Sequence, residues 1–407
     1  MAIDTSIVID SLLMPALQIY DRRERALVSA GDAVLAAVAS VARPFRRRHR
    51  PDAPARILLL RLERIGDLLM ALPAIADARA AAPNAQIDLA VGSWNAEVAR
   101  SIPGINNVVV VDAPWLARGA KGAGAAALAG TAMGWRTRRY DIALNFEPDV
   151  RSNAMLALAG IRWTAGYRSA GGGALLDQAL DYLPREHTVD NARRLVREVL
   201  GEARVPATGR LTIPEARQHE AAALLSGRGR PIVAMHVAGG REVKQWDPQR
   251  FAAVARQLIE DRGATIVLTG GPTDAAIVNS VKQALPASHV VDASTLGSLL
   301  SVAAVLERCD VMITGDTGPM HLAAAVGTPI VAVFGPSDPR RYAPRGPLDR
   351  VIRVDLPCAP CNRIRLPPAR CTGHIPDCLT SVSIDRVLAA AFEVLEASRI
   401  RSMNAPA

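Results

Sequence analysis

The chain has 407 residues, of which 50% are hydrophobic and 4% aromatic, and its formal net charge is +9. This length suits two domains with a large aliphatic core, and the basic charge favours anionic partners such as nucleotides, phosphorylated lipids or a membrane surface. Basic residues do not alternate with aromatic ones, so we expect no nucleic-acid partner.

Residues 1–50 are expected to form a separate helical and basic extension. Apolar residues recur at helical spacing between Leu27 and Val41, and residues 43–50 are rich in arginine. Two interpretations stay open. The segment is either a helix lying on an anionic membrane surface, or a helical extension that packs on the body of the protein or on another subunit. The second interpretation is slightly favoured.

Signals for insertion into a membrane or for secretion are not evident in the sequence. No stretch reaches the roughly 18 uncharged apolar residues of a spanning helix. Asp4 and Asp10 lie where a secretory signal is positively charged. We therefore expect a cytoplasmic protein, and the membrane interpretation of residues 1–50 would place it peripherally on the inner face of the inner membrane.

Residues 56–205 are expected to form a first Rossmann-like domain. Predicted strands alternate with helical segments, which is typical of a parallel sheet with helices on both faces; these strands lie at residues 56–60, 85–91, 108–111 and 140–146. The turn after the first strand contains Gly66 and Asp67 and leads into an apolar helix. Considered alone, a carboxylate at this place is more simply a helix cap than a catalytic group.

A second Rossmann-like domain is expected at residues 230–383, after a polar segment at residues 200–231. Its predicted strands lie at residues 231–237, 265–269, 290–292, 311–313 and 330–334. We expect the terminal helix at residues 384–400 to pack back on the N-terminal domain. Because ligands of such sheets bind beyond the carboxyl ends of the strands, the pattern predicts an α/β protein whose two domains face a cleft.

The segment from Thr314 to Ala325 joins an apolar strand to an alanine-rich helix through the turn Gly-Asp-Thr-Gly-Pro. Small residues let a backbone approach a ligand closely, and the N–H groups and dipole of a helix N-terminus attract anions. The spacing fits an anion-binding turn and an ordinary capped turn about equally well.

Two long motifs resemble those of the bacterial heptosyltransferases of glycosyltransferase family nine. One is Ile-Leu-Leu-Leu-Arg-Leu-Glu-Arg-Ile-Gly-Asp at residues 57–67, and the other is Gly-Asp-Thr-Gly-Pro-Met-His at residues 315–321. The resemblance extends over most of the chain but excludes residues 1–50. It implies a GT-B fold and the transfer of a heptose from ADP-heptose to the lipopolysaccharide core, with inversion at the anomeric carbon.

The resemblance also implies roles for individual residues. Asp67 matches the general base, and Lys244 matches a lysine that contacts the donor phosphate. The other nucleotide-sugar residues that the family implies are Asp316, Thr317, Gly318 and His321. This assignment agrees with the chemistry, because an ionised carboxylate can accept the proton of the acceptor hydroxyl while cations and N–H donors stabilise the leaving diphosphate. Catalysis is therefore expected to need no cofactor.

One loop departs from the family's pattern. The sequence Asn-Phe-Glu-Pro-Asp-Val-Arg-Ser at residues 145–152 replaces a stretch of the Gln-Gly-Leu type. Arg151 and Gly66 remain weaker candidates for contact with the acceptor or the sugar. A different acceptor is one interpretation of this departure, and it makes the heptose less certain than the nucleotide.

Four cysteines lie close together near the C-terminus: Cys358, Cys361, Cys371 and Cys378. Their irregular spacing is compatible with a tetrahedral zinc or iron site and equally with free thiols. The resemblance adds that family members often carry a comparable cluster, and that some autotransporter heptosyltransferases are thought to hold iron with one. A metal here would be structural, because all four ligand places would be filled.

Alternative functions use the same fold. One is transfer from another nucleotide sugar or to a protein acceptor, and another is a catalytically silent GT-B scaffold that acts through residues 1–50. The joint presence of Asp67, Lys244 and His321 argues against a silent protein. A dehydrogenase is disfavoured, since no G-x-G-x-x-G motif follows the first strand.

Overall fold

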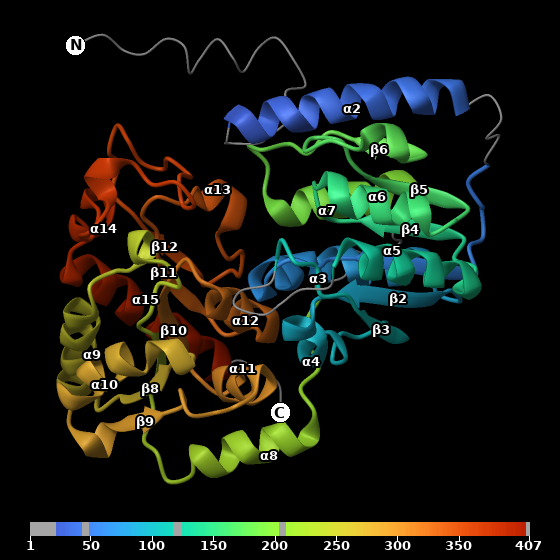
Figure 1. Cartoon of the computed structure of the whole chain (residues 1–407). Helices are drawn as coiled ribbons and strands as arrows, with labels where there is room; N and C mark the ends of the chain where they lie inside the picture. Colours follow the sequence, from blue (N-terminus) through green and yellow to red (C-terminus); the bar gives the residue numbers. More distant parts are fainter. Residues whose placement is uncertain (1–21, 43–48, 117–123, 203–208, 404–407) are drawn as a thin grey trace.

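The computed structural model describes residues 22–42, 49–116, 124–202 and 209–403. They form two parallel six-stranded sheets, one in each half of the chain, with helices packed around both (Figure 1). The strand order is β3-β2-β1-β4-β5-β6 in the first sheet and β12-β11-β10-β7-β8-β9 in the second. Each sheet is thus doubly wound in the Rossmann order, which is the GT-B arrangement predicted from the sequence.

The first sheet consists of β1 (Arg56–Leu60), β2 (Gln86–Val91), β3 (Asn107–Val110), β4 (Ile142–Asn145), β5 (Trp163–Tyr167) and β6 (Gln178–Leu180). Its main helices are α3 (Ile65–Ala81), α4 (Ala96–Ala99), α5 (Ala125–Gly134), α6 (Val150–Leu158) and α7 (Thr188–Leu200). The apolar run of β1 is buried on both faces, as is usual for a central strand of a parallel sheet. The short strands β5 and β6 were not predicted from the sequence.

The second sheet consists of β7 (Ile232–His236), β8 (Thr265–Thr269), β9 (Val290–Asp292), β10 (Val311–Gly315), β11 (Ile330–Val333) and β12 (Arg350–Ile352). Its helices are α9 (Pro248–Arg262), α10 (Ala275–Gln283), α11 (Leu299–Glu307), α12 (Gly318–Val326), α13 (Pro339–Tyr342), α14 (Asp377–Thr380) and α15 (Ile384–Met403). Helix α8 (Glu215–Leu224) lies in the polar segment between the two sheets and packs on α11.

Apolar packing continues from one sheet unit to the other. Helices α3 and α12 are in contact at the junction, and α4 contacts α11 beside them (Figure 1). One cluster of buried residues includes Leu68 and Leu72 of α3 together with Met320 and Ala323 of α12. The junction is therefore a dry contact between two helices, and it fixes how the loops of the two sheets face each other.

The prediction for the terminal helix was wrong. Helix α15 packs on α9, β10, β11 and β12, all of which belong to the second sheet unit. Its apolar residues Val387, Ala391 and Val394 are buried in the core of that unit, and Glu393 pairs with Arg350 at 2.6 Å. An apolar stripe on a helix shows that the helix packs on another element but not on which one.

The N-terminal extension includes a helix, as predicted, but some apolar residues of this helix remain exposed to solvent. Helix α2 (Arg22–Ala42) packs on the short 3-10 helix η4 (Gly173–Leu175), where the Asp32 carboxylate accepts a hydrogen bond from the Gly172 N–H at 2.6 Å. Leu27 and Val34 remain 75% and 64% exposed. The apolar cluster predicted before residue 22 lies outside the described residues. Among the described residues, no helix has the length and apolar character needed to cross a membrane.

Candidate active site

The two sheets place their carboxyl-terminal loops around the junction. Leu60 of β1 pairs with Asn145 of β4, and His236 of β7 pairs with Thr314 of β10, so the ends of these strands are neighbours. In each sheet the chain order reverses between these two strands, and such switch points are where α/β sheets bind ligands. The predicted site residues follow these strand ends, although they come from segments far apart in the sequence.

The N-termini of α3 and α12 approach each other closely, and two glycines make this contact possible. A Cβ added to Gly66 would lie 3.0 Å from Cδ2 of His321, and one added to Gly318 would lie 2.8 Å from Cγ2 of Ile65. Larger residues at these places would push the two helices apart. Asp67, which follows Gly66 in the first turn of α3, is thereby held beside the start of α12.

Lys244 and Asp316 form an ion pair in the second sheet unit. Lys244 ends the short 3-10 helix η5 (Glu242–Lys244) after β7, and its Nζ lies 2.6 Å from Oδ2 of Asp316. Burial raises the pKa of Asp316, but the charge and hydrogen bond of Lys244 and a hydrogen bond from Ser337 outweigh it, so that the net pKa is lowered. The pair thus presents an ionised carboxylate and a cation next to the first turn of α12.

Thr317 and His321 complete the second half of the site. Thr317 is the N-cap residue of α12, and its hydroxyl lies 3.2 Å from that of Thr314. His321 is buried one turn into the helix. Burial lowers its pKa, while the charges of Asp316 and Asp67 act in the opposite direction. The imidazole is therefore neutral at pH 7 and lies between carboxylates from the two halves of the chain.

Around Asp67 lies a charged group that the sequence analysis missed. The Arg61 guanidinium donates from Nη2 to Oδ1 of Asp67 at 3.3 Å and pairs with Glu63 at 3.3 Å. Glu147, which follows β4 and is 1% exposed, accepts hydrogen bonds from the backbone of the β1–α3 turn. The sequence did contain a signal for this group: Arg61 and Glu63 follow one buried strand and Glu147 follows another. Charged residues that directly follow two strands of one parallel sheet meet at the same edge of that sheet.

Residues 133–367, more than half of the chain, match the sequence model of glycosyltransferase family 9 (heptosyltransferase). The protein belongs to this family. It is therefore a glycosyltransferase, as the motifs predicted.

Relatives and solved structures agree with this assignment. Lipopolysaccharide heptosyltransferase 2 of Escherichia coli (strain K12) is 26% identical over 314 residues, which cover 74% of this chain and 88% of the relative. The family 9 glycosyl transferase of Veillonella parvula shares the fold with a TM-score of 0.74 at 24% identity, over 86% of this chain and 100% of that one. The structure of E. coli ADP-heptose lps heptosyltransferase II gives a TM-score of 0.70 at 22% identity, over 84% and 99% of the two chains.

Arg151 of this glycosyltransferase is not part of the group around Asp67. Its guanidinium binds the Asp149 carboxylate at 2.5 Å and lies 4.5 Å from the ring centroid of Trp115. Burial is the main cause that raises the pKa of Glu63 and Glu147, and the charge of nearby Asp149 adds to it. Arg151 therefore contacts Asp149, which lies at the edge of the charged group around Asp67.

The four C-terminal cysteines of the glycosyltransferase are free thiols with different exposure. Cys378 is buried and Cys358 exposed, while Cys361 and Cys371 are partly buried. Burial, and then the three neighbouring thiols, raise the pKa of Cys378 to about 11. Within the described ranges, no three or more His, Cys, Asp or Glu side chains are arranged to hold a metal ion. Of the two interpretations left open by the sequence, this arrangement favours free thiols, and no step of the mechanism uses a metal there.

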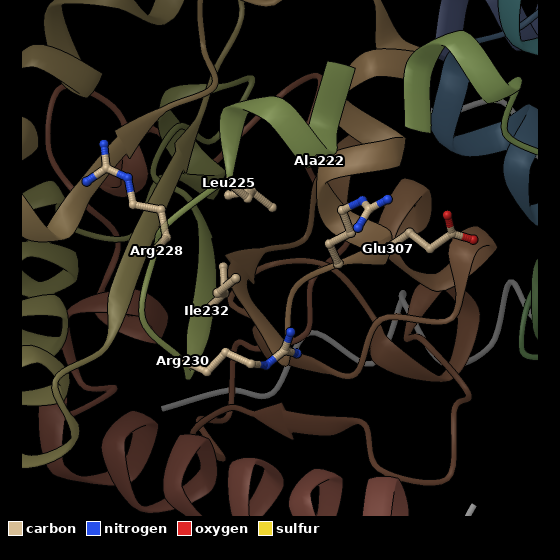
Figure 2. Close-up of a pocket in the computed structure, with 7 residues that line it drawn as sticks. Ala222, Leu225, Arg228, Arg230, Ile232 and Glu307 are labelled. Carbon is tan, nitrogen blue, oxygen red and sulfur yellow. The ribbon is translucent and has the colours of Figure 1, made fainter. Parts of the chain in front are cut away.

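A cavity of about 380 Å³ lies at the opposite edge of the second sheet, beside α8 and the amino end of β7 (Figure 2). It is lined by Arg228, Arg230, Ile232 and Arg308, among others. Figure 2 shows Arg228 and Glu307 on opposite sides with their charged ends directed away from each other. This cavity is at the wrong edge for a Rossmann-type ligand site, and its charged groups do not converge on one point.

Proposed function

We propose that this glycosyltransferase moves a heptose from ADP-heptose to the inner core of lipopolysaccharide, with inversion and with Asp67 as the general base. Its relatives support the donor and the acceptor class: one is lipopolysaccharide heptosyltransferase 2 of E. coli, and a structural neighbour is an ADP-heptose heptosyltransferase. The observation that carries the proposal is the contact of Gly66 with His321, because it brings Asp67 to the start of α12.

The donor's diphosphate is assigned to the first turn of α12. The backbone N–H groups after Thr317 and the dipole of this helix favour an anion there. Lys244, held by Asp316 at 2.6 Å, supplies a positive charge beside the same turn. Because a nucleoside diphosphate leaves as a stable anion, these donors and this cation stabilise the charge that develops as the glycosidic bond breaks.

The acceptor is assigned to the side of the first sheet. Asp67 lies there beside Arg61, and its side chain is 30% exposed, so an acceptor can reach it from solvent. An acceptor hydroxyl near Asp67 gives its proton to the carboxylate as its oxygen attacks the anomeric carbon from the face opposite the diphosphate. The leaving group belongs to the second domain and the base to the first, so this geometry supports inversion.

The test replaces Asp67 by asparagine, which keeps the size of the side chain and removes its basicity. We expect Asp67→Asn to abolish transfer while ADP affinity, measured by calorimetry, stays close to that of the wild type. Asp77→Asn is the matched control, since Asp77 lies on the same helix and pairs with Arg193 at 2.7 Å. Equal loss of transfer and ADP binding in Asp67→Asn would show a structural cap instead of a base.

A second candidate function changes the acceptor or the donor sugar. It is favoured by the loop after β4, where the sequence departs from the family's pattern and the partly exposed Asp149 lies near Glu63. A thermal-shift screen with ADP-, GDP- and UDP-sugars distinguishes the donors, because a ligand that binds only the folded state raises the melting temperature. Stabilisation by ADP-heptose alone would support the first proposal.

Helix α2 is proposed to place the enzyme at the membrane that carries its acceptor. Leu27 and Val34 are exposed on α2, and an arginine-rich run follows this helix in the sequence. We expect the protein to float with vesicles that contain anionic lipid and to lose this property in Leu27→Asp/Val34→Asp. Equal flotation of the wild type and the double variant would favour the alternative, in which the extension only packs on the body of the protein or on another subunit.

A further inference from the structure

The turn that carries Asp67 is held in an unusual way. Arg64, the N-cap residue of α3, makes no side-chain capping hydrogen bond with the described residues. We propose that Arg61 and Glu147 form a clamp, defined by these two side chains, that fixes the Asp67 carboxylate for catalysis. Both are positioning residues, and the inference rests on the proposed role of Asp67 as the base.

Glu147 holds the backbone of the turn from β4. Its Oε1 accepts hydrogen bonds from the N–H groups of Leu62 and Glu63, and the latter bond is 2.7 Å long. Glu147 is itself anchored, because its own N–H donates to Oδ1 of Asn145 at 3.1 Å. The loop just before the N-cap of α3 thus takes its hydrogen-bond acceptor from a residue 85 positions away.

Arg61 holds the side chain and the first helical turn. Its Nη1 donates to the Phe146 carbonyl at 2.6 Å, which ties the guanidinium to the end of β4. Its Nε donates to the Asp67 carbonyl at 3.2 Å, and its Nη2 to Oδ1 of Asp67 at 3.3 Å. The one guanidinium therefore fixes both the backbone carbonyl and the carboxylate of Asp67. We assign the second carboxylate oxygen, Oδ2, to the acceptor hydroxyl.

The other side of the turn is fixed by two more side chains. Trp94 Nε1 and Asn95 Nδ2 donate to the Glu63 carbonyl at 2.9 and 2.7 Å. The turn is thus held from β4 on one side and from the loop after β2 on the other. Only small movements of Asp67 remain, and a base that must meet a hydroxyl within hydrogen-bonding distance depends on such restraint.

The clamp also limits the negative charge next to Asp67. Burial and the charge of Glu63 raise the pKa of Glu147, and burial and the charge of Asp67 raise the pKa of Glu63. Arg61, with a side chain that is 5% exposed, offsets the charges that remain. A protonated Glu147 has the charge and nearly the shape of glutamine, so a glutamine at this position should accept the same two hydrogen bonds.

The experiment compares Glu147→Gln with Glu147→Met in the full-length enzyme. We expect Glu147→Gln to keep kcat close to the wild-type value and Glu147→Met to lower it about 100-fold, the scale for a displaced catalytic group. ADP affinity by calorimetry should stay unchanged in both. Tyr140→Phe is the control for a general loss of stability, because it removes a buried 2.7 Å hydrogen bond to Asp88 far from the turn; its kcat should not fall.

Arg61 is tested by comparing kcat with ADP affinity. Arg61→Gln loses the guanidinium fork that holds the carbonyl and Oδ1 of Asp67, so we expect a lower kcat and an unchanged ADP affinity by calorimetry, with partial rescue of kcat in Arg61→Lys. A simple loss of folded protein would lower the number of ADP-binding sites together with kcat. If Arg61→Gln does not fold, the two Glu147 variants still decide the question.

Two results would overturn the clamp: wild-type kcat in Glu147→Met, or equal impairment of Glu147→Gln and Glu147→Met. Failure of the clamp and failure of the proposed base are distinguishable. If Asp67→Asn still transfers sugar, the base assignment is wrong; if Asp67→Asn is inactive but Glu147→Met is fully active, only the clamp is wrong.

Discussion

Replacing Lys244 by methionine separates the two roles of this lysine, because the change removes the charge and keeps most of the aliphatic volume. In the wild type, Nζ lies 2.6 Å from Oδ2 of Asp316, and the two side chains are only 19% and 10% exposed. At an effective dielectric constant of 20, this attraction is about 6 kcal/mol, and desolvation of the two charges offsets much of it. Because both groups keep some contact with solvent, we expect Lys244→Met to lower the free energy of unfolding by about 3 kcal/mol, the lower end for a broken buried pair.

The double variant Lys244→Met/Asp316→Asn isolates the interaction. It leaves no buried charge without a partner, so its loss of stability should be smaller than the sum of the single losses by about 1–3 kcal/mol. Urea unfolding followed by tryptophan fluorescence measures these differences. The pKa of Asp316 is lower in the folded wild type than in the unfolded chain. Ionised Asp316 therefore contributes to the free energy of unfolding above the pKa of the unfolded chain, and this contribution is lost as the pH falls below about 4. The stability gap between the wild type and Lys244→Met should therefore narrow in acid.

The same substitution tests the donor site. Loss of a charge-assisted contact with phosphate should weaken ADP binding by about 1.5–3 kcal/mol, which is roughly 10- to 150-fold in the dissociation constant. Lys282→Met is the matched control, because Lys282 forms a 2.9 Å pair with Asp292 in the same domain but is 46% exposed. Unchanged ADP affinity in Lys244→Met would remove the lysine from the donor site, and unchanged stability would refute the argument for a buried pair.

Three further predictions concern the framework. Tyr140→Phe should lower the free energy of unfolding by about 1–3 kcal/mol in urea titrations, because the Asp88 carboxylate, 1% exposed, loses a 2.7 Å hydrogen bond; a neutral result would mean that Gln86, Asn107 and Arg138 together satisfy Asp88. Gly66→Ala should lower both kcat and the melting temperature, since its Cβ would lie 3.0 Å from the His321 ring and push α3 and α12 apart, whereas Gly297→Ala, with nothing within 4 Å, should be silent. His187→Asn should flatten the pH dependence of stability: burial lowers the wild-type pKa of His187 to about 4, so its contribution is complete above about 6.5 and is lost as the pH falls from there towards 4, by up to about 3 kcal/mol. If the free energy of unfolding still falls as steeply between pH 6.5 and 4 in His187→Asn, other groups such as His236 cause the acid loss of stability.

Local sequence was enough to predict the repeating units of the fold. The run Ile57–Leu60 and the run Val311–Ile313 are continuous, apolar and short, as buried parallel strands are, and each is followed by a turn and a helix. Most central strands lie within one or two residues of their predicted bounds. The short strands β5, β6 and β12 were missed because three to five residues of mixed character carry no periodic signal.

The site was predicted only as far as its residues lie in motifs. Asp67, Asp316 and His321 were proposed because each belongs to a strand–turn–helix segment whose chemistry can be recognised locally, and their roles stay predictions. Arg151 was a weaker candidate for contact with the acceptor or the sugar, and its guanidinium contacts Asp149 and Trp115. Glu147 and Arg61 were missed, since their importance depends on partners in other strands.

The sequence by itself determined which segments become strands and helices and which turns can bind an anion, because these properties depend on residues within a few positions of one another. The tertiary structure alone decided that Gly66 contacts His321, that Glu147 reaches the turn 85 residues before it, and that α15 packs on its own domain. In a parallel sheet, neighbouring strands are joined by long crossovers, so the groups that meet at a switch point are distant in the chain. Their meeting is set by strand order and by the packing of α3 against α12, which no local pattern records.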